Sequence, residues 1–483
     1  MTSVIIPNSV TSIGESAFCD SGLTSIVIGN GVKEIAAETF FRDYKLTTIV
    51  WGDSVETIGR SAFAGVNLES LTLPNSVKTI GYGAFSSCRN LESVALPNSV
   101  KSIEEYAFAA CISLSSVTIG SSVSSIGQGV FADCENLAEI NIDKDNATYC
   151  SVDGVLYTKD KSELLLCGAG KTGDLTIPNG VITILPQAFY NCQKITSMVT
   201  STTVKTIGEE AFFYCVGLKS LKISDSVTTI EDNAFYGCEG LENIIIGNSV
   251  EAIGEYAFAG LGEGVTSIHL PKTLTTLGVG AFVGCSALKE ITVDEANPVF
   301  SSIDGALFSK DETMLIQAGG GIVGEYIIPN AVKTIGAAAF SNCYNLTSVE
   351  FPEELTAIKE GAFNSCGKLS SIEIPNSVVE IGANSFSSCR SMTSLIIGES
   401  VQTIGRSAFY GCTSLTSIVI PNSVVTVDVG AFAFCYGLTS ITIGSGLKSI
   451  ANQMFRECQT LTEVTIPDTV DLIDYMAFAS CSE

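Results

Sequence analysis

The sequence predicts a mainly β solenoid, one elongated domain spanning residues 1–483, with about 18 stacked repeats and two β-hairpin insertions. Three observations lead to this fold class: a phenylalanine recurs at nearly fixed spacing, each interval contains a short strand pattern, and two longer intervals match each other. Most intervals are 23 residues long, and such a period is typical of repeats that bury apolar residues against their neighbours. The recurring residues are Phe18, Phe40, Phe63, Phe85, Phe108, Phe131, Phe189, Phe212, Phe235, Phe258, Phe282, Phe340, Phe363, Phe386, Phe409, Phe432, Phe455 and Phe478.

Within one repeat, the residue types predict a strand, a turn, a second extended piece and one short helical turn. Leu91–Leu96 ends in a two-residue alternation of aliphatic side chains, which is typical of a strand with one buried face. Pro97–Asn98 ends that strand in a turn, and Val100–Ile103 forms the second extended piece. Glu104–Phe108 has room for one helical turn with the phenylalanine pointing inward. Since 23 residues are too few for a full crossover helix, β structure and turns should dominate.

The two longer intervals are 58 residues each and are related by a constant offset of 151, because residues 146–189 match residues 297–340. Each contains an Asp-Gly pair between alternating apolar residues, Asp153-Gly154 and Asp304-Gly305, which is a strong hairpin signal. We therefore expect a β-hairpin packed on the stack at about residues 143–177 and again at about 294–328. The chain is then a duplicated super-repeat with one insertion in each copy.

Charge and hydropathy limit the classes of partner. The formal net charge of −26 argues against nucleic-acid binding, which needs basic surface to neutralise phosphates. Mean hydropathy is +0.37, yet no run approaches the ~18 consecutive apolar residues of a transmembrane helix, so we expect no membrane insertion. The first residues lack the pattern of a signal peptide, and polar end caps are missing, so we expect a fragment of a longer protein.

The repeat pattern Leu-x-x-Ile-x-Ile-Pro-x-Ser-Val-x-x-Ile-Gly-x-x-Ala-Phe-x-x-Cys resembles the BspA-type leucine-rich repeat, and residues 415–424 show its first half plainly. The resemblance covers essentially the whole chain. It implies a right-handed leucine-rich-repeat solenoid with a parallel sheet on its concave face, and binding roles at cell surfaces or in secreted proteins. The chain departs from the pattern where Ser21, Asp43, Val66 and Leu261 replace the cysteine and where Trp51 replaces an aliphatic residue.

The cysteines are expected to be structural. Fourteen of the seventeen lie three residues after a recurring phenylalanine and should form a ladder of reduced, buried thiols, because parallel Cβ directions suit disulfides poorly. Zinc would need clustered ligands such as paired Cys-x-x-Cys, which the sequence lacks, and the acidic residues before each hairpin lack the EF-hand spacing of a calcium loop. We therefore expect no metal and no cofactor.

Two cysteines differ from this ladder. Cys150 and Cys167 both lie in the first insertion, and their counterparts in the second are Ser301 and Ala318. Their joint absence from the second copy suggests a disulfide across the hairpin, with two unrelated thiols as the alternative.

Catalytic candidates are few. His269 is the only histidine, and no partner for it is visible in the sequence. Glu350 and Glu373 hold equivalent outward positions in adjacent repeats, near the carboxyl separation of retaining glycosidases, but a pair of solvated surface glutamates explains them better. We therefore expect a protein that is not an enzyme.

The outward positions of the strands form the predicted binding face, which is poor in charge and rich in serine and threonine. Its candidate binding residues are Ile245, His269, Glu350, Glu373, Ile396 and Val419. The leading hypothesis is an interaction or adhesion module that binds a protein through its concave or hairpin surface. Glycan binding is an alternative that the lack of outward aromatic residues disfavours, ice binding is disfavoured by the charged interruptions, and a structural spacer also remains open.

Overall fold

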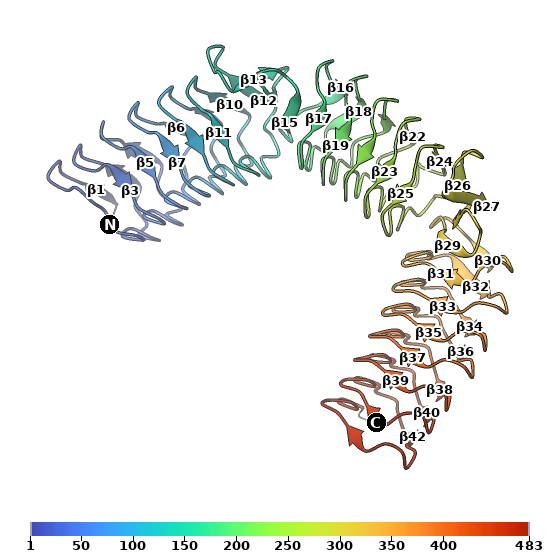
Figure 1. The fold of residues 1–483 in the computed structure, drawn as a ribbon. Helices are drawn as coiled ribbons and strands as arrows, with labels where there is room; N and C mark the ends of the chain where they lie inside the picture. Colours follow the sequence, from blue (N-terminus) through green and yellow to red (C-terminus); the bar gives the residue numbers. More distant parts are fainter. Residues whose placement is uncertain (1, 482–483) are drawn as a thin grey trace. The chain divides into compact units, whose positions relative to one another are not determined.

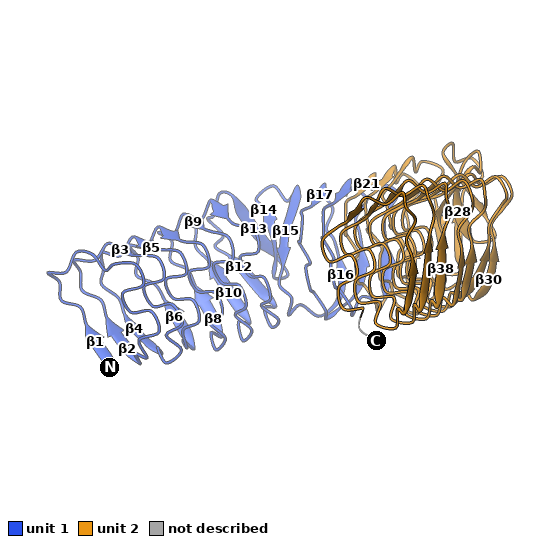
Figure 2. Cartoon of the chain, turned by 90° about the horizontal axis from the view of Figure 1, so that it is seen from below, with its two compact units in different colours: residues 1–227 blue, residues 228–483 orange. Residues whose placement is uncertain are grey.

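The computed structural model describes residues 2–481, which contain strands and turns and no helix. The chain divides into two compact units, residues 1–227 and 228–483 (Figure 2). Each unit is a stack of rungs, and one rung consists of a long strand, a short strand and a turn that carries the recurring phenylalanine (Figure 1). The predicted mainly β, parallel solenoid is confirmed. The placement of the long strands on a concave side stays a prediction, as does the single domain.

The long strands have three to five residues and follow the Leu-x-x-Ile-x-Ile pattern. In the first unit they are β1 (Ser3–Ile5), β2 (Ser25–Val27), β4 (Thr48–Val50), β6 (Ser70–Thr72), β8 (Ser93–Ala95), β10 (Ser116–Ile119), β12 (Glu139–Ile142), β16 (Gly173–Thr176), β18 (Ile195–Val199) and β20 (Ser220–Lys222). In the second unit they are β22 (Asn243–Ile245), β24 (Ser267–Leu270), β26 (Glu290–Val293), β30 (Gly324–Ile327), β32 (Leu346–Glu350), β34 (Ser371–Glu373), β36 (Ser394–Ile396), β38 (Ser417–Ile420), β40 (Ser440–Ile443) and β42 (Glu463–Thr465).

The short strands have two residues each. In the first unit they are β3 (Glu34–Ile35), β5 (Thr57–Ile58), β7 (Thr79–Ile80), β9 (Ser102–Ile103), β11 (Ser125–Ile126), β17 (Thr183–Ile184) and β19 (Thr206–Ile207). In the second unit they are β21 (Thr229–Ile230), β23 (Ala252–Ile253), β25 (Thr276–Leu277), β31 (Thr334–Ile335), β33 (Ala357–Ile358), β35 (Glu380–Ile381), β37 (Thr403–Ile404), β39 (Thr426–Val427), β41 (Ser449–Ile450) and β43 (Leu472–Ile473).

The register follows the sequence period. β8 pairs in parallel with β10 so that Ser93 lies opposite Ser116 and Val94 opposite Val117. The middle residue of the long strand is buried and its two neighbours face outward, as in the exposed–buried–exposed pattern of β8. Equivalent residues of successive rungs therefore stack in columns, and the outward columns predicted from the sequence lie on one face.

The segment around each recurring phenylalanine, here called the phenylalanine turn, is not the predicted helical turn. The residues two before and two after every recurring phenylalanine have positive φ, as Tyr106 (56°) and Ala110 (57°) do around Phe108. Left-handed residues interrupt a right-handed helix. The N–H groups of these three residues donate to carbonyl oxygens of the next rung, 2.7–3.2 Å away, rather than within the segment. The prediction of short helical turns is therefore wrong, and successive β-turns take their place.

The core is a column of phenylalanine rings beside a column of thiols. Neighbouring rings are nearly parallel, with centroids 5.4 Å apart for Phe85 and Phe108 and 5.1 Å apart for Phe363 and Phe386. Each ladder thiol donates to a carbonyl of the preceding rung, as Cys111 Sγ does to the Phe85 oxygen at 3.3 Å. Because both columns are in register, the side chains of each rung cover those of the next rung.

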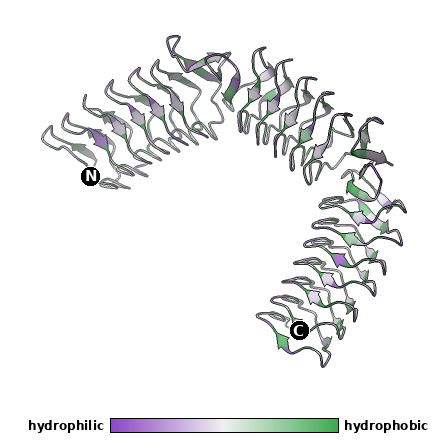
Figure 3. Cartoon of the chain, in the orientation of Figure 1, coloured by the Kyte–Doolittle hydropathy of each residue, from purple (hydrophilic) through white to green (hydrophobic). Residues whose placement is uncertain are grey.

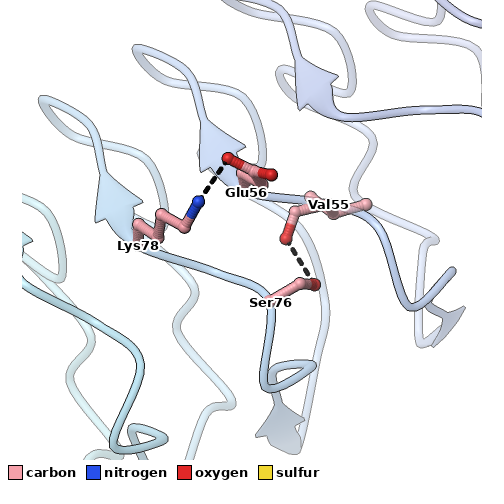
Figure 4. A network of polar contacts seen from close by, with 4 residues as sticks. All are labelled: Val55, Glu56, Ser76 and Lys78. Atoms are coloured by element: carbon pink, nitrogen blue, oxygen red, sulfur yellow. Dashed lines mark hydrogen bonds and ion pairs between the residues drawn. The ribbon is translucent and has the colours of Figure 1, made fainter.

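Side chains also tie neighbouring rungs together at the surface (Figure 4). Lys78 Nζ lies 2.6 Å from Glu56 Oε2, and Ser76 Oγ donates to the Val55 carbonyl oxygen at 2.7 Å. The pairs repeat in the second unit, where Lys359 Nζ lies 2.9 Å from Glu380 Oε2. Because both ion pairs are exposed, their contribution to stability is small.

Each insertion adds an antiparallel piece that ends as part of the stack. β13 (Tyr149–Val152) pairs antiparallel with β14 (Val155–Thr158), and β14 with β15 (Glu163–Cys167), which then pairs in parallel with β17. In the second unit β27 (Phe300–Ile303), β28 (Ala306–Ser309) and β29 (Met314–Gln317) repeat this order, and β29 pairs with β31. Each unit thus has one extra rung, in which β15 or β29 occupies the position of the short strand.

These extra rungs are truncated. Residues 168–172 connect β15 directly to β16, whereas residues 127–138 connect β11 to β12 in the preceding regular rung. The shortcut omits the phenylalanine turn. It needs Gly168 and Gly170, because a Cβ on either would overlap the backbone of Asn136–Leu137. Gly319 and Gly321 meet the same restriction in the second unit.

Candidate functional site

The six predicted binding residues lie on the long-strand face of the second unit. Ile245, Ile396 and Val419 are more than half exposed, which is unusual for aliphatic side chains and marks them as accessible. His269 is exposed as well, and its Nδ1 lies 3.0 Å from Thr292 Oγ1 on the neighbouring strand. The face therefore offers isolated apolar residues among hydroxyl groups.

Glu350 and Glu373 are exposed and lie on the neighbouring strands β32 and β34. No hydrogen bond or ion pair to either side chain occurs among residues 2–481, and neither residue lines a pocket that the structure describes. His269 is on β24, and the long strands β26 and β30 come between β24 and β32 in the chain. The structure thus brings no third polar group to the two carboxylates.

Cys150 and Cys167 are not brought together. Cys150 lies opposite Tyr157 on one side of β14, and Cys167 lies opposite Val155 on the other. With β14 between them, their backbones are about 9–10 Å apart, beyond the reach of a disulfide. Both thiols are free, and each lies near a backbone carbonyl instead.

Asp143 and Asn146 make local contacts at the start of the first insertion. Asp143 Oδ1 accepts the N–H of Asp145 at 2.9 Å, which is a local turn contact rather than a metal site. Asn146 is fully buried: its Nδ2 donates to the carbonyl oxygens of Gly120 and Val123, and its Oδ1 accepts the N–H groups of Thr148 and Tyr149. Within residues 2–481 no group of three metal-ligating side chains gathers.

Burial keeps several ladder thiols in their neutral form. Burial raises the pKa values of Cys285, Cys343 and Cys389 to about 12. A buried neutral thiol is a poor nucleophile and a poor metal ligand. The thiol column therefore contributes to core packing, and candidate functional residues are sought at the surface.

Exposed tyrosines gather on the phenylalanine turns, a feature that the sequence reasoning missed. Nine tyrosines on or next to these turns are between 37% and 63% exposed, and together they define what we call the tyrosine edge. Its members are Tyr44, Tyr82, Tyr106 and Tyr214 in the first unit and Tyr256, Tyr344, Tyr410, Tyr436 and Tyr475 in the second.

Rings of the tyrosine edge contact one another between rungs. The Tyr82 and Tyr106 rings meet edge to face with centroids 5.7 Å apart, and the Tyr410 ring lies 5.0 Å from Phe434. Arg60 lies over the Tyr82 ring at 5.5 Å. Such contacts hold amphipathic rings in place at the surface, which is the property that protein-binding surfaces use.

A signal for this edge is present in the sequence. Eleven of the fourteen tyrosines lie within four residues of a recurring phenylalanine. These tyrosines lie outside the two outward strand columns that form the predicted binding face. Because the phenylalanine turn was expected to be helical, its outward positions could not be assigned.

Comparison with known proteins agrees with this architecture. The sequence matches the family described as "BspA type Leucine rich repeat region" in six copies, over residues 1–65, 33–152, 167–289, 258–314, 323–436 and 356–483. No curated protein matches the chain. No helix among the described residues has the length and apolar character needed to cross a membrane.

Three solved structures resemble the chain. A leucine-rich repeat protein from Eubacterium ventriosum is 25% identical, with a TM-score of 0.55 over 69% of this chain and 93% of that one. A leucine-rich cell surface protein from Faecalibacterium prausnitzii is 26% identical, with a TM-score of 0.51 over 77% and 87%. The pneumococcal vaccine antigen PcpA is 23% identical, with a TM-score of 0.50 over 68% and 83%, and shows the fold alone.

Proposed function

Because this chain belongs to the BspA-type leucine-rich repeat family, we propose that it is a non-enzymatic interaction module that binds a protein partner through its tyrosine edge. The observation that carries the proposal is the set of nine exposed tyrosines, four in the first unit and five in the second. Tyrosine supplies a large amphipathic contact at low entropic cost, and it is enriched at energetically dominant interface positions. The long-strand face around Ile396 and Val419 is a second surface for the same partner class.

A location at the cell surface is part of the proposal. Its support is the printed description of the Faecalibacterium prausnitzii protein as a cell surface protein, together with the acidic, regular exterior of this chain. An adhesion role would follow if the partner belongs to another cell.

Glycan binding is the second candidate, and exposed rings are the observation that favours it, since sugars stack on aromatic faces. A protein partner and a glycan would use the same tyrosines with different geometry. A structural spacer would use neither the tyrosines nor the long-strand face.

The test compares two double variants with the unaltered chain on protein and glycan arrays. The edge variant carries Tyr410→Ser and Tyr436→Ser, and the face variant carries Ile396→Lys and Val419→Lys. Loss of two interface tyrosines costs about 2–4 kcal/mol, so protein binding by the edge variant should weaken about 30-fold or more. If only the face variant loses protein binding, the site lies on the long strands. If the edge variant loses glycan binding, glycan binding is favoured. If both variants bind as the unaltered chain does, a structural spacer is favoured.

A further inference from the structure

We propose that the space left by the truncated rung of the first unit, here called the notch, binds a short segment of a partner protein in which a basic residue precedes a phenylalanine or leucine by three positions. The inference rests on the proposed protein-binding function and assigns it a second, separate site. The segment would take the place of the missing phenylalanine turn.

The notch is a pocket of about 480 Å³ between the phenylalanine turns of Phe131 and Phe189. Its apolar lining includes Ile126, Leu165 and Leu166, which are only half-buried, whereas Ile103, the counterpart of Ile126 in the preceding rung, is buried. Figure 3 shows β15, which carries these leucines, as a hydrophobic strand. The volume is within the usual range of ligand pockets, and the floor suits one large apolar side chain.

Backbone groups along one wall of the notch lack partners. In a regular rung, three alternate N–H groups of the phenylalanine turn donate to the next rung. The equivalent N–H groups of Gly129, Phe131 and Asp133 have no acceptor within residues 2–481. Backbone donors are normally paired, so these N–H groups can donate to the carbonyl oxygens of an added segment.

The opposite wall offers acceptors. The carbonyl oxygens of Pro186 and Tyr190 receive no hydrogen bond from the described residues, and that of Ala188 accepts the N–H of Cys167 at 2.7 Å. The two walls are separated by the truncated rung, so their spacing is about two strand separations, or 9–10 Å. One peptide backbone fits between them. Donors on one wall and acceptors on the other match the two edges of a phenylalanine turn.

The rim of the notch is acidic. Asp133 and Glu210 line it, and no lysine or arginine does. Gln128 Nε2 donates to Gln187 Oε1 at 3.1 Å, and Gln187 Nε2 donates to Glu210 Oε2 at 2.8 Å, so this carboxylate is held at the mouth. Burial and then the nearby carboxylates raise the pKa of Tyr190, as expected for a negative rim. A basic side chain on the segment complements this charge.

The second unit carries different side chains at the equivalent place. Gln317 stands where the first unit has Leu166, is 2% exposed, and its Nε2 lies 3.4 Å from the carbonyl oxygens of Ala338 and Ala339. Val283 stands where the first unit has Ala132, and it packs with Ala338. A pocket of about 710 Å³ remains at this place in the second unit, but neither Ile316 nor Gln317 lines it, whereas Leu165 and Leu166 line the notch of the first unit.

The test uses the whole chain and a peptide copied from its own residues 57–65, Thr-Ile-Gly-Arg-Ser-Ala-Phe-Ala-Gly, which carries arginine three positions before phenylalanine. Fluorescence anisotropy of the labelled peptide measures binding, and the same peptide with serine in place of phenylalanine is the control ligand. The notch variant is Leu166→Gln, which copies the second unit, and the matched protein control is Ile396→Gln on the long-strand face. We expect the unaltered chain and Ile396→Gln to bind equally, and Leu166→Gln to bind at least tenfold more weakly.

The notch would be rejected as the binding site if Leu166→Gln bound the peptide as tightly as the unaltered chain, or if the unaltered chain did not bind it. If Leu166→Gln does not fold, Ala132→Val takes its place with the same expectation, because valine already stands at the matching position. Self-association of the unaltered chain that Leu166→Gln abolishes would assign the notch to a second copy and overturn the partner segment. If the peptide does not bind the unaltered chain but the edge variant still loses its protein partner, the notch is rejected as a binding site and the proposed function stands.

Discussion

At the residue scale, the column three positions after each phenylalanine shows how strictly stacking constrains side chains. Fourteen rungs place a cysteine there, all but Cys481 are buried, and the thiol donates a weak hydrogen bond to the preceding rung, as Cys111 does. Asp43 occupies the same position and is fully buried. Its Oδ2 accepts the hydroxyl of Ser21 at 2.6 Å, while its Oδ1 has no partner. The sequence marked Asp43 as a departure, but only the structure shows an unsatisfied carboxylate oxygen.

We predict that Asp43→Cys raises the free energy of unfolding of the first rungs by about 1–3 kcal/mol, since it removes a buried unsatisfied acceptor. Fluorescence of Trp51, the only tryptophan, measures this in guanidinium titrations, because its ring lies 5.2 Å from Phe63 in the same part of the stack. The exposed Asp53→Ser should change stability by less than about 0.5 kcal/mol. A lower stability for Asp43→Cys would contradict the interpretation of this carboxylate as a defect.

At the element scale, the phenylalanine turns and the hairpins differ in how far the sequence revealed them. The Asp-Gly pairs located the β13–β14 and β27–β28 turns, because both residues take positive φ there. The phenylalanine turns also require positive φ at two positions each, yet glycine occupies only ten of those thirty-six positions. Residues such as Tyr256 and Phe434 carry no turn signal, so the helical prediction failed. Hydrogen bonds to the next rung compensate for the backbone strain.

The hairpins are anchored by one buried asparagine each. Asn146 makes four hydrogen bonds to backbone groups, and Asn297 repeats them with Pro271, Leu274, Val299 and Phe300. These contacts join the start of the insertion to the preceding rung and fix the direction in which β13 or β27 leaves the stack. The repetition at an offset of 151 shows that the anchor is part of the inserted element.

We predict that Asn297→Ala lowers the free energy of unfolding by about 3 kcal/mol or more, because it removes all four hydrogen bonds that this buried side chain makes with the backbone. Thermal unfolding with hydrogen exchange of β27 and β28 provides the measurement. Asn345→Ala is the matched control, since the Asn345 side chain accepts only one exposed contact from Lys368. Equal effects of the two substitutions would show that the anchor does not hold the hairpin.

At the scale of the whole molecule, the thiol column couples stability to alkaline pH. Burial raises the pKa values of Cys285, Cys343 and Cys389 to about 12, above an unfolded value near 9. For a group whose pKa is higher in the folded state, the stabilisation is complete below the unfolded pKa and is lost as pH rises toward the folded pKa. Each such thiol then removes about 1.4 kcal/mol per pH unit from the stability between pH 9 and 12.

We predict that the chain unfolds steeply between pH 9 and 12 and that the triple variant Cys285→Ala, Cys343→Ala, Cys389→Ala reduces the slope by about 4 kcal/mol per pH unit. Denaturant titrations of the second unit at several pH values give the slope. At pH 7 the triple variant can be less stable through lost packing, so the comparison is of slopes alone. The variant that replaces the exposed Cys19 by alanine should leave the slope unchanged.

The sequence by itself determined the number of regular rungs, the buried columns and the register, because these follow from apolar spacing along the chain, which the stack copies residue for residue. The tertiary structure decided the rest. Backbone dihedrals and hydrogen bonds to the next rung set the phenylalanine turns, and with them the outward direction of the tyrosine edge. The separation of Cys150 from Cys167 by β14, and the notch beside Leu166, depend on how an insertion joins the stack. No period in the sequence encodes that junction, since it occurs once in each copy and the two copies line it with different side chains.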